Sequence, residues 1–378
     1  MNTNKDISNN FKQLIYIGVI GILFIPMIQG KLKIFNLHPL QGAIEHQEDP
    51  YFTKEGWFDG SYQKAQEEFT KNDFGFRPLF VRSHNQIYYT LFKEAKASGV
   101  IIGKEGFLYE SNYISEYNGA LTIGEDSISK KIQYLSEIES KLRAKGKQLL
   151  IVLAPGKGSY YPEYIPDDYP RPEKVVTNYD IWEKQLSRST ITYLDFHKWF
   201  REIKASAPYP LFPKTGIHWS RYGEIIAADS MVNFIRDSFN INLPEISIDN
   251  IETSSEVKHR DDDIEQGMNI LENLPDLKMA YPSISSSGGT PAYAITVADS
   301  YYWGLYSDTV VNDLFGNGEF WYYNQEMHSF KNETAIPLDQ LDIKASIDKA
   351  KIVILLGTDA NLHRFPFGFE DRMLKSLD

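Results

Sequence analysis

Ser300 is the first residue whose type and setting suggest chemistry. Residues 291–300 read PAYAITVADS, and their apolar run predicts a buried strand that leads directly into Asp299 and Ser300. A serine hydroxyl is a weak nucleophile that requires an adjacent base. On local pattern alone, the same residues also fit an Asp-Ser turn or a helix cap.

A base for this serine is available in the segment 214–223, KTGIHWSRYG. His218 lies in this turn-rich stretch just before a predicted helix, and Trp219 and Ser220 follow it. A loop histidine can act as a general base because its pKa is easily tuned near neutrality. The alternative is a residue at the entry of the helix, with Ser220 as the actual cap.

Predicted helices and apolar strands alternate around these two residues. Strands separated by helices indicate an α/β fold with a mainly parallel sheet flanked by helices on both faces. In such sheets the reactive groups lie just beyond the carboxyl ends of the strands, which is where Ser300 is expected. The predicted helices are 126–145, 177–188 and 221–239, and the predicted strands are 148–155, 191–196, 291–300 and 349–358.

The remaining segments have weaker signals. Residues 61–98 show helical spacing of apolar residues, interrupted by a turn at 72–77, and residues 100–109 predict a hairpin. Residues 244–288 contain an acidic run and a loop of small residues, so we expect them to be irregular.

Composition excludes several classes of function. The net charge of -12 argues against nucleic-acid binding, which needs an excess of Lys and Arg to neutralise phosphates. The sequence has no cysteine, which excludes disulfides, thiolate metal sites and cysteine nucleophiles. It has no HxH or HExxH pairing and no phosphate-binding loop, so we predict neither a metal nor a cofactor.

The N-terminus predicts a membrane anchor. Residues 14–28, LIYIGVIGILFIPMI, carry no charged side chain, and lysines flank them on both sides. This run is shorter than the ~20 residues that a helix needs to span a bilayer, but no small-x-small cleavage site follows it. We therefore expect an uncleaved signal anchor whose flanking lysines extend the span, with the C-terminal bulk exported. The alternatives are a cleaved signal peptide and a buried helix.

Five short motifs, in order, resemble the SGNH hydrolase-like domain of the alginate O-acetylation proteins, the AlgX/AlgJ family. The resemblance runs from about residue 72 to the end of the chain. Each motif is weak alone, and their order behind an N-terminal anchor makes the signal specific. The motifs are NDFGFR (72–77), VIIGKEGFLY (100–109), APGKGSYYPEYIP (154–166), HWSRYG (218–223) and ADS (298–300).

The resemblance implies an extracytoplasmic O-acetyltransferase that moves acetyl groups onto hydroxyls of an exopolysaccharide. Ser300 would carry the acetyl group as an ester, and His218 would deprotonate first Ser300 and then the sugar hydroxyl. Implied partners are the polysaccharide acceptor and a membrane-bound acyltransferase that supplies acetyl groups. The implied location is the cell inner membrane, with one span and the bulk of the chain in the periplasm.

The sequence departs from the family at one position. The family's histidine motif has an aspartate two residues before the histidine, where this chain has Gly216. In a serine protease the acid of the triad can raise the rate by up to ~10⁴-fold. Three alternatives follow: the acid comes from another segment, the site works as a Ser–His dyad, or the site is inactive. Asp359, at the end of the fourth strand, is our first candidate. Asp195, at the end of the second strand, is the alternative. Asp263 is also available, but its charge run is typical of a solvated loop.

Other candidate residues would bind the oxyanion or the sugar. We expect the backbone N–H of Ser300 or Tyr301 to form part of an oxyanion hole. Lys157 and Ser159 follow the first strand on the same edge, and Lys157 is equally well explained as a solvent lysine. The aromatic candidates for stacking on sugar rings, some of which must be core residues, are Tyr160, Tyr161, Tyr301, Tyr302 and Trp303.

Two rival functions remain open at this level. A carbohydrate esterase would use the same Ser–His pair with water as acceptor, and a glycan-binding or assembly component would be catalytically weakened. The predicted organisation is a cytoplasmic tip and signal anchor (1–30), a linker with an N-terminal helical segment (31–98) and the SGNH hydrolase-like domain (99–378).

Overall fold

The computed structural model describes residues 3–42, 49–332 and 334–377. The chain forms two compact units. The first comprises Met1–Ser98 together with Glu265–Asn273, and the second comprises Gly99–Ile264 and Leu274–Asp378. One boundary between the units lies between Ser98 and Gly99, and the short segment Glu265–Asn273 belongs to the first unit.

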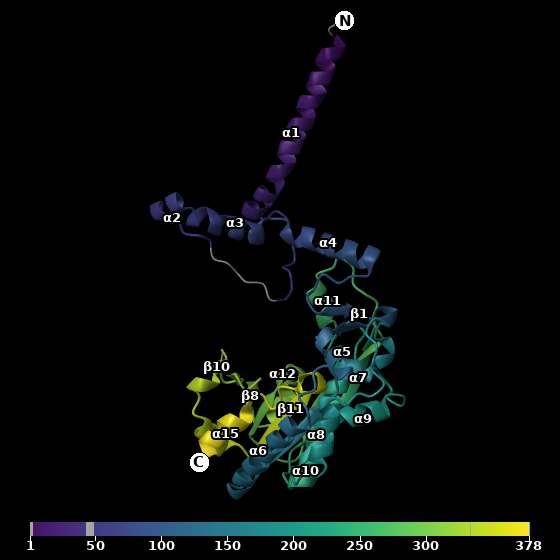
Figure 1. Ribbon diagram of the computed structural model, residues 1–378, viewed down its shortest axis with the longest axis vertical. Helices are drawn as coiled ribbons and strands as arrows, with labels where there is room; N and C mark the ends of the chain where they lie inside the picture. Colours follow the sequence, from purple (N-terminus) through teal and green to yellow (C-terminus); the bar gives the residue numbers. More distant parts are fainter. Residues whose placement is uncertain (1–2, 43–48, 333, 378) are drawn as a thin grey trace. The chain divides into compact units, whose positions relative to one another are not determined.

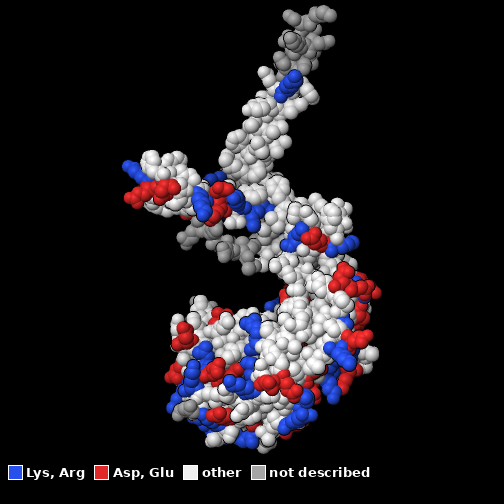
Figure 2. All heavy atoms as spheres, in the orientation of Figure 1, with Lys and Arg blue, Asp and Glu red and all other residues white. Residues whose placement is uncertain are grey.

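The first unit is helical, as the apolar spacing of residues 61–98 predicts. It contains α1 (Thr3–Leu32), α2 (Lys54–Asp59), α3 (Ser61–Asp73) and α4 (Arg77–Phe92). Residues Phe11–Leu32 of α1 form a 22-residue apolar stretch, long enough and apolar enough to cross a membrane. Figure 2 shows few charged side chains along the described surface of α1, whereas Lys, Arg, Asp and Glu are interspersed over the second unit.

The end of α1 is fixed against the turn between α3 and α4. A Cβ at Gly75 would lie 2.2 Å from the backbone nitrogen of Gly30, so only glycine permits this close approach. The amide of Gln29, a buried side chain, donates to the carbonyl of Phe35 over 2.7 Å and accepts from its N–H over 3.0 Å. The Phe35 and Phe76 rings also meet, with centroids 5.9 Å apart.

The second unit is built around a seven-stranded sheet with the order β10-β9-β8-β7-β11-β3-β4 (Figure 1). The strands from β8 to β4 are parallel to one another, and β9 and β10 extend the sheet as antiparallel strands. The mainly parallel sheet is therefore confirmed. Its strands are β3 (Gln148–Ala154), β4 (Tyr193–Asp195), β7 (Ala294–Ala298), β8 (Glu319–Tyr322), β9 (Glu326–His328), β10 (Ile336–Pro337) and β11 (Ile352–Thr358).

Helices connect these strands and cover the sheet. The α-helices of this unit are α5 (Ser111–Tyr117), α6 (Glu125–Ala144), α7 (Lys157–Tyr160), α8 (Asn178–Leu186), α9 (Phe196–Ile203), α10 (Arg221–Phe239), α12 (Tyr302–Ser307), α13 (Thr309–Leu314), α14 (Ile343–Lys349) and α15 (Phe369–Leu377). A short helix, α11 (Asp263–Met268), begins in this unit and continues into the first.

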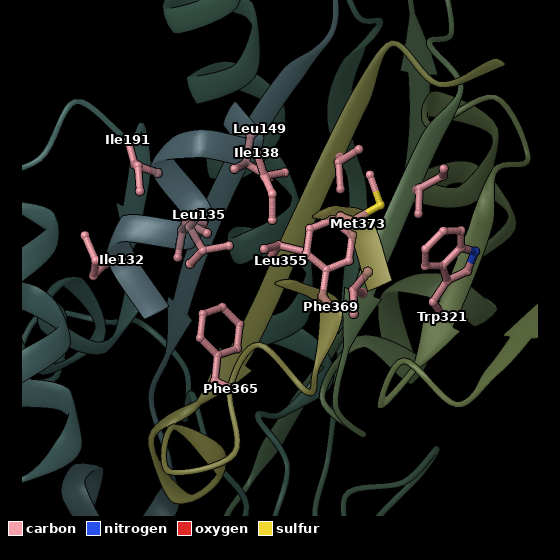
Figure 3. Packing of buried hydrophobic residues seen from close by; sticks show 14 of the residues in the cluster. Ile132, Leu135, Ile138, Leu149, Ile191, Trp321, Leu355, Phe365, Phe369 and Met373 are labelled. Carbon is pink, nitrogen blue, oxygen red and sulfur yellow. The ribbon is translucent and has the colours of Figure 1, made fainter. Parts of the chain in front are cut away.

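The main hydrophobic core lies on one face of the sheet. Alternate residues of β3 and β11, such as Leu149 and Leu355, meet the apolar stripe of α6 and the side chains of α15 (Figure 3). In these two strands the side chains that point to either face of the sheet are buried, which explains their nearly continuous apolar sequences. Full burial of each large aliphatic side chain contributes about 1.5–3 kcal/mol.

The expectation that residues 244–288 are irregular is wrong. They contain an antiparallel pair, β5 (Glu245–Ser254) and β6 (Met279–Ser287), that forms a separate two-stranded sheet. Much of β5 is exposed and polar, and its apolar alternation is limited to Ile246 and Ile248 before a shift of register at Asn250, so the signal for a strand is short. The predicted hairpin near the start of the domain is present as β1 (Val100–Ile102) and β2 (Leu108–Glu110).

Candidate active site

Three neighbouring strands end together at the edge where Ser300 lies. Ala298 of β7 pairs with Leu356 of β11, and Thr358 of β11 pairs with Ala154 of β3. The residues that follow these strands therefore gather at one carboxyl edge, as expected for a parallel sheet.

Ser300 and His218 lie in direct contact at this edge. The Oγ atom of Ser300 is 2.9 Å from Nε2 of His218, within hydrogen-bond distance. The side chain of His218 is largely buried, with 12% of it exposed. Ser220 caps α10 by accepting from the N–H of Gly223 over 3.0 Å, which fixes the helix start just after the histidine.

The acid beside this pair is Asp263. Its Oδ2 forms a hydrogen bond with Nδ1 of His218, and its Oδ1 accepts from the N–H of Ile217 over 2.8 Å. Ser300, His218 and Asp263 therefore have the geometry of a nucleophile, a base and an orienting acid. The acidic run at 261–263 resembled a solvated loop in sequence, yet its last residue begins α11 and faces the histidine.

The two acids preferred from the sequence lie elsewhere. Asp359 binds the hydroxyl of Ser159 and the backbone N–H of Ala360. Asp195 caps α9 by accepting from the N–H of Lys198 over 2.8 Å, and it also accepts from the Tyr179 hydroxyl. Strand-end position brought both carboxylates to the correct edge, but neither hydrogen-bonds to His218.

Gly216 explains why the acid comes from a different segment. A Cβ at this position would lie 2.5 Å from the backbone oxygen of Asp261 and 2.8 Å from its carbonyl carbon. The segment that ends in Asp263 thus occupies the space that a side chain at position 216 would need.

Lys157 does not take the oxyanion- or sugar-binding place that the sequence suggested. Its side chain is fully buried, and its ammonium donates to the carbonyls of Lys214 and Gly216 over 2.8 and 2.6 Å. Asp276 accepts from the N–H groups of Lys214 and Thr215 over 2.9 and 2.8 Å. These contacts hold the backbone that leads to His218, so Lys157 positions the base.

Tyr301 is also a positioning residue in this structure. Its hydroxyl donates to the carbonyl of Ile217 over 2.7 Å, and its ring meets the ring of His218 edge-on. Its backbone N–H binds Asp299 over 3.1 Å and is unavailable to an oxyanion. The N–H of Ser300 makes no hydrogen bond to any residue that the structure describes, which leaves it as the candidate oxyanion donor.

Asp299 holds the nucleophile turn against the end of β11. Its fully buried carboxylate accepts from the N–H and hydroxyl of Thr358 over 2.8 and 2.7 Å, and from the amide of Asn361 over 2.9 Å. The sequence analysis gave no role to Asn361, because nothing local distinguishes it from a turn residue.

Trp303 is half-buried in an aromatic cluster beyond the nucleophile. Its ring lies edge-on to Phe320 and His328, with centroids 4.9 and 4.6 Å away, and also packs against Tyr306 and Tyr322. Tyr160, Tyr161 and Tyr302, by contrast, are buried side chains.

The charge of Asp263 raises the pKa of His218 and so makes the histidine a stronger base. Burial alone lowers the pKa of His218, but the charge and hydrogen bond of Asp263 outweigh it and raise the pKa above its ordinary value. Burial acts to raise the pKa of Asp263, and the histidine overcomes this and holds the carboxyl below its usual range. Among the described residues, no group of three or more acidic or histidine side chains is placed to hold a metal ion.

A parallel α/β sheet with Ser, His and Asp side chains at its carboxyl edge has the arrangement of the serine hydrolase-like class. Residues 100–266 match the family model described as "SGNH hydrolase-like domain, acetyltransferase AlgX". This match confirms the resemblance to the AlgX/AlgJ family and the SGNH hydrolase-like fold. The matched region includes His218 and Asp263 but ends before Ser300.

Curated relatives named AlgJ match part of the chain. The probable alginate O-acetylase AlgJ of Pseudomonas fluorescens is 26% identical over 186 residues, which are 49% of this chain and 45% of that protein. The corresponding protein of Pseudomonas syringae pv. tomato is 24% identical over 210 residues, which are 56% and 51% of the two chains. The chain thus spans about half the length of these curated relatives.

One solved structure also aligns with much of this chain. The O-acetyltransferase domain of Pseudomonas putida AlgJ aligns with a TM-score of 0.46 and 14% identity, over 74% of this chain and 99% of that one.

Proposed function

We propose that this chain is an extracytoplasmic O-acetyltransferase that moves acetyl groups onto hydroxyls of an exopolysaccharide through an acetyl ester on Ser300. One observation carries the proposal: Ser300 Oγ lies 2.9 Å from His218 Nε2, while Nδ1 of the same ring binds Asp263. The names of the AlgJ relatives, probable alginate O-acetylases, support acetyl as the acyl group and a polysaccharide as the acceptor.

The chemistry follows from this geometry. His218 Nε2 accepts the proton of Ser300 as Oγ attacks the acetyl carbonyl of the donor, and the protonated imidazole then returns that proton to the leaving group. In the second half, the sugar hydroxyl loses its proton to His218 and attacks the ester. The bond to Oγ breaks and Ser300 recovers a proton. Asp263 holds the ring and stabilises its charged form.

We further propose that α1 is a single-pass anchor in the cell inner membrane, with the second unit in the periplasm. The 22-residue apolar stretch Phe11–Leu32 supports the span. A membrane-bound acyltransferase that delivers acetyl groups across the membrane is the partner that such an enzyme requires, because the proposed site lies on the outer side.

Trapping the ester tests the mechanism. The full-length chain in detergent is treated with an activated acetyl ester, and its peptides are analysed by mass spectrometry. We expect an acetyl group on Ser300 in the wild type, far less in His218→Ala and none in Ser300→Ala. No adduct on the wild type would overturn both the transferase and the esterase, and favour a glycan-binding component.

The acceptor distinguishes the two enzymes. When oligosaccharide is added to the trapped ester, a transferase forms acetylated sugar in excess of free acetate. An esterase releases acetate at the same rate with or without the sugar.

A further inference from the structure

One side of α4 is an apolar stripe that is exposed on the first unit. Phe80, Ile87 and Leu91 follow one another at intervals of seven and four residues, which places them on the same side of the helix. Each of these residues is more than half exposed, and Leu91 is 70% exposed. Contiguous apolar surface of this kind marks a face that another molecule or a lipid phase covers.

The opposite side of α4 is held within the first unit. The amide of Asn85, a buried residue, donates to the carbonyl of Met268 over 2.8 Å. The side-chain oxygen of Gln86 accepts from the N–H of Leu271 over 3.0 Å. Arg82 donates to two backbone carbonyls of the segment between α1 and α2. These contacts fix the rotation of α4 about its own axis, so the stripe stays on the outside of the unit.

A second apolar surface lies on α2 and the residues around it. Phe58 is 88% exposed. The rings of Phe52 and Trp57 meet with centroids 5.9 Å apart, and those of Phe52 and Tyr62 meet with centroids 5.3 Å apart. Trp57 and Tyr62 line an open hollow of about 640 Å³ together with Phe74, which follows α3. These five residues form the aromatic surface of the first unit.

The turn between α3 and α4 joins the stripe and the aromatic surface to the end of α1. The ring of Phe80 stacks on that of Phe74 with centroids 5.9 Å apart, so the two surfaces meet at this turn. Gly75, in the same turn, packs against the backbone of Gly30, within the apolar stretch Phe11–Leu32. In Figure 1, α3 and α4 leave the turn crosswise to α1. A helix that lies along a membrane surface has this direction relative to one that crosses the membrane.

The lysines near these surfaces fit a membrane interface. Four of them stand at or next to the ends of α1, α2 and α4: Lys31, Lys33, Lys54 and Lys93. Aromatic side chains and lysines are enriched at the depth where a span leaves the bilayer, because their apolar parts reach lipid while their polar ends reach water and phosphate. A bilayer would cover the stripe and the aromatic surface together, whereas a protein partner would have to match both. Lipid is therefore the occupant that the composition favours.

We propose that the stripe of α4 and the aromatic surface lie in the headgroup region of the outer leaflet of the membrane that α1 spans. The inference rests on the proposed anchor and does not depend on acetyl transfer. It gives the first unit an attachment along the membrane surface in addition to the single span. Lys64 and Glu68, on the side of α3 opposite Tyr62, then face water.

Depth measurements with single labels test the proposal. The sequence has no cysteine, so Phe58→Cys and Leu91→Cys can each be labelled at one place with an environment-sensitive fluorophore. The full-length chain is then placed in vesicles of zwitterionic and anionic phospholipid. We expect blue-shifted emission, quenching by lipids that carry a nitroxide near the headgroup, and protection from aqueous iodide. Glu68→Cys is the control and should be quenched by iodide and not by the nitroxide lipid.

Charges placed on the stripe give a second test. Ile87→Glu combined with Leu91→Glu puts two carboxylates on this side of α4, and glutamate is a good helix former, so the helix is retained. Because burial of a carboxylate is costly, we expect a label at Phe80→Cys to shift to the red and to become open to iodide. Lys64→Glu, on the charged side of α3, should leave that label protected. An unmoved label in the doubly charged variant would overturn the proposal.

A label at Leu23, in the middle of the proposed span, separates the ways to fail. If it lies within the bilayer while labels at Phe58 and Leu91 are open to iodide, the interfacial proposal is wrong and the anchor stands. If Leu23 is also open, both the anchor and the interfacial proposal are wrong, whereas the trapped ester on Ser300 tests the enzyme separately. Protection at Phe58 and Leu91 in native membranes but not in pure lipid would indicate a protein partner and overturn the lipid assignment.

Discussion

Asp263 and Asp195 allow a paired test at the scale of single residues. Asp263→Asn keeps the acceptor for the Ile217 N–H but removes the charge beside His218, so we expect kcat to fall by roughly 10²–10⁴. Asp195→Asn alters a helix cap and should retain most of the rate while lowering stability by at most about 1 kcal/mol. Steady-state acetyl transfer and thermal unfolding measure both effects. Equal rate losses in the two variants would contradict the role given to Asp263.

The histidine also fixes the sign of the pH dependence. Only neutral His218 accepts a proton, so acylation of Ser300 should rise with pH through the histidine pKa and then level off. Because Asp263 raises that pKa, the inflection should lie above the ordinary ~6.5. In Asp263→Asn, burial remains and the charge is gone, so the inflection should move to lower pH. A stopped-flow pH profile of acylation measures it, and an unmoved inflection would contradict the coupling.

Strand-end position favoured Ser300, and a turn-rich segment before a helix favoured His218; the two side chains lie 2.9 Å apart. The acid was not predictable by the same means. Strand-end position favoured Asp359 and Asp195, yet the ring is held by a residue from a distant loop. The carboxylates at 261–263 form a charge run, and nothing in such a run shows which member is turned inward. Lys157 was equally ambiguous, because a lysine after a strand is usually solvated, whereas this one satisfies buried carbonyls.

At the scale of elements, Gly216 allows two segments to pack closely. Gly216→Ala would press a methyl group against the carbonyl of Asp261, so we expect a loss of about 1–3 kcal/mol in stability and slower acyl transfer as Asp263 shifts. Gly267→Ala, on α11 with no atom within 4 Å of its Cβ, is the control; it should leave acylation unchanged and should not lower stability, because alanine favours a helix more than glycine does. Thermal unfolding measures the stability of the two variants, and acylation rates measure their activity. Unchanged acylation in Gly216→Ala would show that the two segments tolerate separation.

The buried elements were the predictable ones. Strands β3, β7 and β11 are almost entirely apolar because both of their faces are covered, and α10 begins and ends where its apolar spacing and cap indicate. The strands β5 and β6 were not predicted because residues that are exposed to solvent need not be apolar. The short strands β8, β9 and β10 at one side of the sheet were missed because they have only four, three and two residues.

At the scale of the whole chain, the anchor predicts how the protein fractionates. The full-length chain should remain with membranes after washing with high salt and alkaline carbonate, because α1 is held by apolar contact with lipid rather than by charge. In spheroplasts, protease added outside should digest the second unit. Immunoblotting of the fractions measures both. Release by carbonate, or protection of the second unit until lysis, would contradict the proposed topology.

The helix α11 has a further consequence. It starts at Asp263, and from Glu265 onward the chain belongs to the unit that contains α1. In that unit, Asn85 of α4 donates to the carbonyl of Met268 over 2.8 Å. Asp263, which binds the imidazole of His218, and Met268, which is held by Asn85, therefore belong to one helix of six residues.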